Sequence, residues 1–257
     1  MVWWMDVFVA VFGAVVGSFL NVCIWRLPEE RSIVTPRSFC PACGHPIRFY
    51  DNIPLLSYLL LRGQCRDCQA RIPWRYPLVE GLTGAMALLL FWKYGLSVQF
   101  LVAFIFVASL LVITFIDMDH QIIPDVITLP GIPIFFLVAV FVMEVPFYEA
   151  LWGLLAGGGI LYLIATVYAF VRKQEGMGGG DIKLLAMLGA FLGWKSLVFI
   201  ILVSSLTAAI VGIALIVLRG KDMQYAVPFG PFLSLAAIAY IFWGDLFMRA
   251  LFMMHYR

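Results

Sequence analysis

Long apolar runs separated by short polar segments dominate this chain. A membrane-spanning helix needs about 20 consecutive, mostly apolar residues, and eight runs of roughly that kind follow one another. They cover approximately residues 6–25, 77–95, 98–117, 126–143, 149–171, 181–194, 196–218 and 228–250. The pattern therefore predicts an all-α polytopic membrane protein with about eight transmembrane helices, of which the run 181–194 is the shortest.

The composition supports a membrane protein. Of the 257 residues, 63% are hydrophobic and only 12% are charged, and the mean hydropathy is +1.00. Soluble globular domains carry about twice that proportion of charged residues. The first run is followed by the sequence RLPEE and not by a small-residue cleavage site, so we expect it to be retained as a helix.

The basic residues indicate which segments face the cytoplasm. Eight of the 17 lysines and arginines lie from Arg26 to Arg75, and others recur in alternate later loops. The positive-inside rule then places approximately residues 26–76, 117–126, 172–181 and 219–227 in the cytoplasm. We find no internal repeat. The expected organisation is a first transmembrane helix (1–27), a cytoplasmic loop domain (28–76) and a transmembrane domain of about seven helices (77–257).

Four of the five cysteines form two CxxC pairs. The pairs are separated by 21 residues and comprise Cys40 with Cys43 and Cys65 with Cys68. Four thiolates at this spacing are typical of a zinc ribbon, in which a tetrahedral metal supplies folding energy that a small loop lacks. Disulfides are the alternative, but the predicted cytoplasmic location disfavours them. We expect Cys23 to pack inside the first helix and His45 to be a solvated loop residue.

Four aspartates lie at predicted helix ends next to the bilayer, where a charge is costly and often marks function. Asp117, Asp119 and Asp125 cluster in FIDMDHQIIPD, and Asp181 follows a run of glycines. By the predicted topology all four lie on the cytoplasmic side, so a carboxylate from the third run and one from the sixth can meet at one depth. Two carboxylates that share a proton can act as general acid and general base on a peptide bond.

The glycines before Asp181 suggest a special backbone. Residues 178–180 are all glycine, which permits a sharp turn and a close approach of a substrate strand. A plain helix cap is the alternative, because Asp is a favoured N-cap residue and Gly a common helix breaker. We expect Lys183 either to hydrogen-bond near Asp181 or to extend to the membrane interface.

Taken together, these features resemble the type IV prepilin peptidases. The resemblance rests on GSFLNVCIWRLP (17–28), the two CxxC pairs, RYPLVEGLTG (75–84), FIDMDHQIIPD (115–125), GMGGGDIK (176–183) and PFGPFL (228–233). The order and spacing of these motifs extend over almost the whole chain, and the GxGD signature of this aspartic peptidase class is met at residues 178–181.

The resemblance implies a bifunctional enzyme of the bacterial inner membrane with its active site facing the cytoplasm. It would cleave the basic leader from type IV prepilins or from the pseudopilins of type II secretion, and then methylate the new N-terminus with S-adenosylmethionine. It makes the transmembrane domain of residues 77–257 an aspartic peptidase domain. Within it, catalysis is assigned to Asp117 and Asp181, with Gly178, Gly180 and Lys183 in the active-site loop. For the methyl donor it suggests only candidates in or next to the large loop, namely Asn21, Arg26, Pro28 and Glu80. For Arg26 a topology anchor is the simpler interpretation, whereas Glu80 requires a buried partner.

Helix position suggests roles for the two aspartates. Asp181 is expected at the start of a helix, where free N–H groups favour the ionised carboxylate, and Asp117 at the end of one, where unpaired carbonyls disfavour it. We therefore expect Asp181 to be the base and Asp117 the acid, on a bias of about 0.3–1 kcal/mol at each end. Asp119 and Asp125 are expected to be dispensable for cleavage.

Three further classes of protein fit parts of the pattern. A zinc-sensing membrane transporter would place its carboxylates near the bilayer midplane and often has paired halves, whereas these carboxylates lie at one face and the halves do not match. The second class is a GxGD-class peptidase without methyltransferase activity, and the third is an assembly scaffold without any activity. The expected partners are the pilin substrate and membrane lipid, and no nucleic acid.

Overall fold

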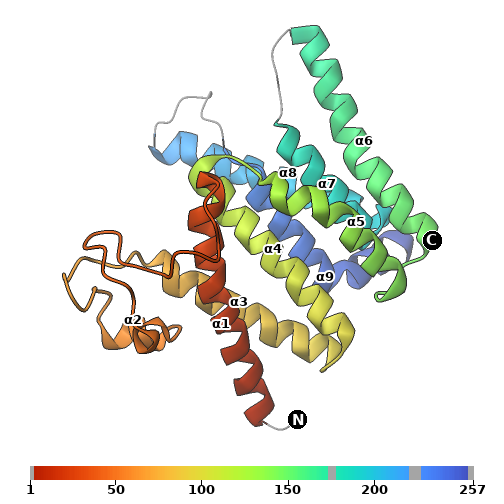
Figure 1. Ribbon diagram of the computed structural model, residues 1–257. Coiled ribbons are helices and arrows are strands. Elements are labelled where there is room, and N and C mark those ends of the chain that lie inside the picture. The colour runs from red at the N-terminus through yellow and green to blue at the C-terminus, as the bar shows by residue number, and fades with distance from the viewer. Residues whose placement is uncertain (1–2, 173–177, 220–226, 254–257) are drawn as a thin grey trace. The chain divides into compact units, whose positions relative to one another are not determined.

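The computed structural model describes residues 3–172, 178–219 and 227–253, and within them every regular element is helical. Figure 1 shows the chain order. The long helices are α1 (Trp3–Arg26), α3 (Arg75–Tyr94), α4 (Val98–His120), α5 (Asp125–Phe141), α6 (Phe147–Arg172), α7 (Gly179–Leu192), α8 (Trp194–Arg219) and α9 (Gly230–Met253). The loop between α1 and α3 contains three short helices: η1 (Leu27–Glu29), η2 (Phe49–Asn52) and α2 (Leu56–Leu60).

Each of the eight predicted runs forms a helix, but not each helix is long enough to cross a membrane. Among the described residues, five segments are sufficiently long and apolar: Trp3–Glu29, Val98–His120, Phe147–Tyr168, Trp194–Leu218 and Gly230–Arg249. The helix α5 is apolar but shorter. The helix α7 has 14 residues, and at about 1.5 Å per residue it spans only about two thirds of a hydrocarbon core of about 30 Å. The predicted all-helical membrane architecture is confirmed, while eight membrane crossings are not.

The chain divides into two compact units, residues 1–112 and 113–257. In the first unit α1 and α3 pack closely because small residues face each other. A Cβ at Gly13 would lie 2.6 Å from the Ala87 Cβ, and one at Gly17 would lie 2.7 Å from the Glu80 Cα. Small residues at such positions let two helix backbones approach within a membrane. This contact holds the two ends of the 28–76 loop side by side.

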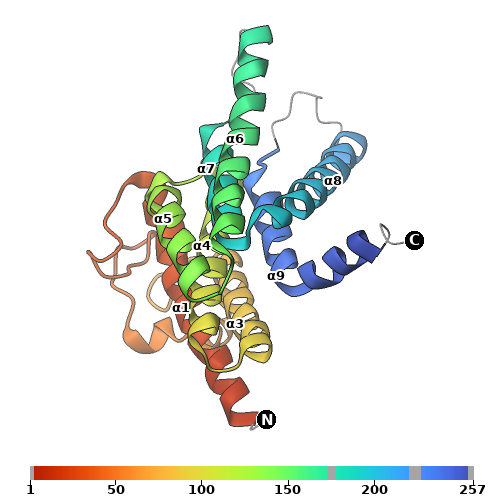
Figure 2. The same ribbon diagram turned by 90° about the vertical axis from the view of Figure 1, so that its right-hand side faces the viewer.

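In the second unit the short helix α7 is surrounded by longer ones. It packs against α5, α6, α8 and α9, and its residues 184–191 are all buried. Figure 2 shows α6 running alongside α7 and extending beyond it. The N-terminus of α7, which carries Asp181, is thereby fixed against its neighbours.

Some sequence features lie outside the described residues. These are Gly176 and Met177 of the glycine-rich motif, and the predicted cytoplasmic basic residues Lys173 and Lys221. Arg172 and Arg219 are the last residues of α6 and α8.

Candidate functional site

The two CxxC pairs lie on two turns with the same hydrogen-bond pattern. The Cys40 N–H donates to the His45 carbonyl at 2.9 Å, and the Cys65 N–H donates to the Ala70 carbonyl at 2.8 Å. An isolated antiparallel bridge closes each turn, from residue 39 to 46 and from residue 64 to 71. The loop therefore contains a structural repeat of two knuckles that we did not detect in the sequence, since the two segments share little beyond the cysteines.

The four cysteines come together as a possible metal site. Their Sγ atoms all lie within 4.8 Å of one another, and the Sγ atoms of Cys40 and Cys68 are 3.8 Å apart. Zinc–sulfur bonds of about 2.3 Å in a tetrahedron place the sulfurs roughly 3.8 Å apart, so the cluster fits such an ion. Burial raises the pKa of the Cys40 thiol, but hydrogen bonds from the backbone of Cys43 and Ala42 outweigh it and lower the pKa to about 7. His45 is exposed and Cys23 is buried, as predicted.

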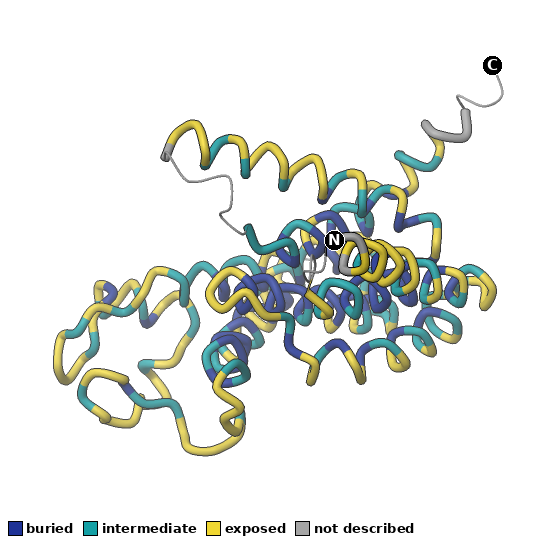
Figure 3. Tube along the Cα trace, turned by 90° about the horizontal axis from the view of Figure 1, so that it is seen from above, coloured by how far each residue is buried: buried dark blue, intermediate teal, exposed yellow. Residues whose placement is uncertain are grey.

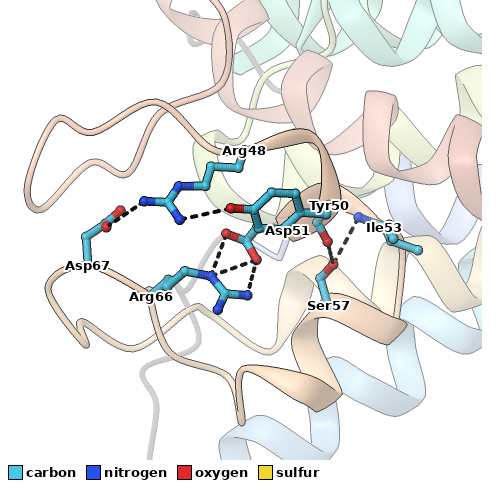
Figure 4. A network of polar contacts seen from close by, with 7 residues as sticks. All are labelled: Arg48, Tyr50, Asp51, Ile53, Ser57, Arg66 and Asp67. Carbon is cyan, nitrogen blue, oxygen red and sulfur yellow. Dashed lines mark hydrogen bonds and ion pairs between the residues drawn. The ribbon is translucent and has the colours of Figure 1, made fainter.

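A network of charged residues joins the second knuckle to η2 (Figure 4). The Arg66 guanidinium donates from Nε and Nη2 to the carboxylate of Asp51, at 2.9 and 2.6 Å. Arg48 donates to the Tyr50 hydroxyl at 2.9 Å and lies 3.8 Å from an oxygen of Asp67. The hydrogen bond from Arg66 lowers the pKa of Asp51. This network was not predicted from the sequence, although the charges between Cys65 and Cys68 were a signal for it.

A cavity of about 450 Å³ lies in the first unit between the loop and the α1–α3 pair. Most of the loop is exposed, as Figure 3 shows. The cavity is lined by loop residues and by side chains of both helices, among which Asn21, Arg26 and Glu80 are buried. Three of the sequence candidates for donor binding line it, namely Asn21, Arg26 and Glu80. Cys40 and Cys65 lie along its wall as well.

All three candidates have hydrogen-bond partners, and Asn21 in addition retains one unpaired buried atom. Arg26 donates to the carbonyls of Ser32 and Pro36, at 2.9 and 2.8 Å. The Glu80 carboxylate accepts from the Leu55 N–H at 2.8 Å, which supplies the buried partner that the sequence required. The Asn21 Nδ2 donates to the Tyr76 carbonyl, whereas its buried Oδ1 has no hydrogen-bond partner among the described residues.

In the second unit, Asp117 and Asp181 line one pocket of about 540 Å³. Asp117 lies in the last turn of α4 and is buried, and Asp181 lies in the first turn of α7. Both positions were predicted. The pocket also receives Gly178, Gly180 and a largely apolar wall that includes residues 122–123 and 227–229.

The environment of Asp117 differs from the one expected. Its Oδ2 accepts a hydrogen bond of 2.9 Å from the Gly230 N–H at the start of α9. A hydrogen bond to a charged group contributes about 1.5–3 kcal/mol, more than the 0.3–1 kcal/mol typical of a helix end. The Asp181 side chain accepts no such bond within the described part of the chain. Both aspartates therefore lie at the helix ends that were predicted, but the contact of Asp117 with the start of α9 was not foreseen. With this contact, the ends of α4 and α7 no longer suffice to assign the roles of base and acid.

The glycines before Asp181 do not act through an unusual backbone. Gly178 is the N-cap of α7, with φ of −66°, and Asp181 is three residues further on, so Asp181 is not itself the cap. The need for glycine is steric at Gly180, where a Cβ would lie 2.9 Å from the Ile123 Cβ.

The other charged candidates are arranged differently. Lys183 pairs with Asp125 and not with Asp181: its Nζ donates to both oxygens of Asp125, at 2.7 and 2.8 Å. This ion pair joins α7 to α5 at the edge of the pocket and was not foreseen. Asp119 is exposed and does not line the pocket.

Comparisons with known proteins agree with the resemblance. Residues 11–94 match the Bacterial Peptidase A24 N-terminal domain, and residues 104–213 match the Type IV leader peptidase family. Proteins named "Prepilin leader peptidase/N-methyltransferase" are similar over most of their length. The one from Pseudomonas putida is 40% identical, covering 91% of this chain and 89% of the relative. Those from Aeromonas hydrophila and Neisseria gonorrhoeae are 42% and 41% identical, covering 94% and 88% of this chain and 91% and 86% of the relatives.

No solved structure matches the chain. The matches nevertheless extend over both units, and the first family covers the cysteine loop while the second covers both pocket aspartates. This chain belongs to the type IV leader peptidase family.

Proposed function

We propose that this protein cleaves the leader peptide from type IV prepilins or pseudopilins and then methylates the new N-terminus. The observation that carries the peptidase activity is the pair Asp117 and Asp181, which line one pocket from two different helices. The relatives named prepilin leader peptidase/N-methyltransferase support both activities. The rival of a transporter gains no support, because the carboxylates lie at helix ends.

The pocket suits peptide hydrolysis. One carboxylate takes a proton from water, whose oxygen forms a bond to the scissile carbonyl carbon, while the other gives a proton to the carbonyl oxygen. The C–N bond then breaks, and the released amine takes up a proton. The apolar wall beside the aspartates is suited to the hydrophobic segment that follows a leader.

The proposed membrane topology follows from the distribution of the basic residues. The loop of residues 28–76 and the pocket face the cytoplasm of a bacterial inner-membrane protein, and a pilin precursor lies in the bilayer with its basic leader inside. The eight helices from residue 6 to 250 would then include shorter ones, α5 and α7, held among longer neighbours.

The cysteine cluster is proposed to hold zinc in a structural role. Four cysteines complete a tetrahedral shell and leave no open position for catalysis. The ion would fix the two knuckles that form part of the cavity wall in the first unit.

The cavity in the first unit is proposed to hold S-adenosylmethionine. Its volume of about 450 Å³ lies within the usual range for small-molecule sites. The unpaired Asn21 Oδ1 is an acceptor suited to an amino group of the donor, and the Glu80 carboxylate is suited to a cationic ligand. When bound, this donor supplies the methyl group for transfer to the amine. Arg26 holds the segment of residues 32–36, which leads to Ser38 and Phe39 in the wall of the cavity.

A cleavage and methylation assay in proteoliposomes tests the proposal. Asp117→Asn and Asp181→Asn should each abolish cleavage of a prepilin, yet leave methyl transfer to a pilin that is supplied already cleaved. Glu80→Gln should show the reverse pattern and weaken donor binding measured by calorimetry. A wild-type protein that cleaves but transfers no labelled methyl group would identify a peptidase without methyltransferase activity. Full cleavage by either asparagine variant would exclude the aspartate pair.

A further inference from the structure

We propose that Gly230 is a positioning residue for Asp117, whose ionised carboxylate it holds in place for action as the general base. The inference rests on the proposed peptidase activity and assigns roles within it. It concerns a residue beyond the 104–213 segment that matches the peptidase family.

Two features of Gly230 act on Asp117. Its backbone N–H donates to the Asp117 Oδ2 at 2.9 Å, and both groups are buried. A Cβ at this position would lie 2.7 Å from the same oxygen and 3.2 Å from the Asp117 Cγ. Only glycine therefore lets the N–H and the carboxylate approach in this way.

The bond favours the charged form of Asp117. A carboxylate accepts hydrogen bonds more strongly when ionised, and the donor is one of the first N–H groups of α9, which have no partner within their own helix. Asp117 is thus better suited than Asp181 to take the proton from water, and Asp181 to protonate the carbonyl oxygen. This assignment is the reverse of the one that the ends of α4 and α7 suggest.

The other charged groups around the pocket do not change the assignment of Asp117 as the base and Asp181 as the acid. Asp181 faces the pocket from α7, and Asp125 from α5 is paired with Lys183. The segment before α9 contributes only the apolar residues Val227, Pro228 and Phe229. Gly230 is therefore the hydrogen-bond donor that distinguishes the two aspartates among the described residues of the pocket.

The test is the pH dependence of prepilin cleavage by Gly230→Ala in proteoliposomes. A smaller fraction of Asp117 is ionised at a given pH when the bond is lost, so the acid limb of kcat/KM should move to higher pH by roughly one to two units. The loss should appear in kcat and leave KM nearly unchanged. The matched control is Gly212→Ala in α8, where an added Cβ meets nothing within 4 Å, and its profile should equal that of the wild type.

A second variant separates this effect from general crowding. A Cβ at residue 230 would also lie 3.2 Å from the Ile123 Cδ1. Gly230→Ala combined with Ile123→Ala should keep the shifted acid limb relative to Ile123→Ala alone. An unshifted limb in Gly230→Ala, or restoration of the limb by Ile123→Ala, would overturn the inference. A wild-type protein without any cleavage would instead contradict the proposed function.

Discussion

Replacing Arg26 with lysine separates two explanations of this residue. Lysine keeps the positive charge at the end of α1, which is all that a topology anchor needs. It does not keep the planar fork with which Arg26 donates from Nη1 to the Ser32 carbonyl and from Nη2 to the Pro36 carbonyl. The structure therefore predicts that Arg26→Lys loosens the segment after α1 without changing the orientation of the protein.

The magnitude follows from the loss of one of the two bonds. A hydrogen bond from a charged donor contributes about 1.5–3 kcal/mol, and Arg26 is only 4% exposed, so water does not readily replace the lost partner. Local opening of the segment should become easier by roughly 10- to 100-fold, at about 1.4 kcal/mol for each tenfold.

Hydrogen exchange of the protein in lipid nanodiscs measures this opening. The amides of Glu30 and Arg31 donate to the carbonyls of Leu27 and Arg26, both at 3.1 Å, so they report on this turn. Their exchange should accelerate by the predicted factor in Arg26→Lys, while peptides from α4 exchange as in the wild type. Unchanged exchange with unchanged orientation would refute the structural role and leave Arg26 as a topology anchor.

Three further predictions concern the loop and the pocket. Protein purified without chelator should contain about one zinc per chain and Cys68→Ser should contain less; metal-free protein with all four clustered thiols open to alkylation would contradict this. Asp119→Asn should retain most prepilin cleavage because Asp119 is exposed and does not line the pocket. Asp125→Asn should do so because its partly exposed ion pair with Lys183 contributes only about 0.2–1 kcal/mol. A loss of cleavage as complete as that expected for Asp117→Asn or Asp181→Asn would show that the residue is needed for catalysis and contradict this prediction. Arg66 lowers the pKa of Asp51 from its ordinary 3.8, so the stabilisation by this pair is complete above that value and is lost as the pH falls through the lowered pKa. Asp51→Asn should therefore lower the thermal midpoint of the loop equally between about pH 5 and about pH 8, and a difference that disappears within this range would be inconsistent with the ion pair.

Local patterns in the sequence were sufficient to predict the eight long helices and the cysteine cluster, but not the three short helices of the loop. An apolar run predicts a helix without reference to the rest of the chain, and two CxxC pairs specify four ligands through their spacing alone. The apolar runs predicted more membrane crossings than the helices support, because crossing also depends on length and charge. The helix α7 is short, and α3 carries Arg75, Glu80 and Lys93.

Contacts between distant backbone groups could not be predicted in this way. The Gly230 N–H and Asp117 are 113 residues apart. Every residue except proline has a backbone N–H, so the sequence does not show which of them donates to an aspartate. The PFGPFL motif was recognised, but its contact with an aspartate depends on how α9 packs. The bond between Lys183 and Asp125 likewise depends on the packing of α5 against α7, because the sequence offered Lys183 several carboxylates.

The glycines between α6 and α7 restrict how the pocket can change shape. A Cβ at Gly153 would overlap the carbonyl of Gly189, and a Cβ at Gly189 would overlap the carbonyl of Gly153. Two backbones in such contact cannot slide or rotate past each other without first separating. The helices α6 and α7 therefore move as one rigid body. A movement that changes the distance from Asp181 to Asp117 either moves α6 together with α7 or is made by α4 and α9.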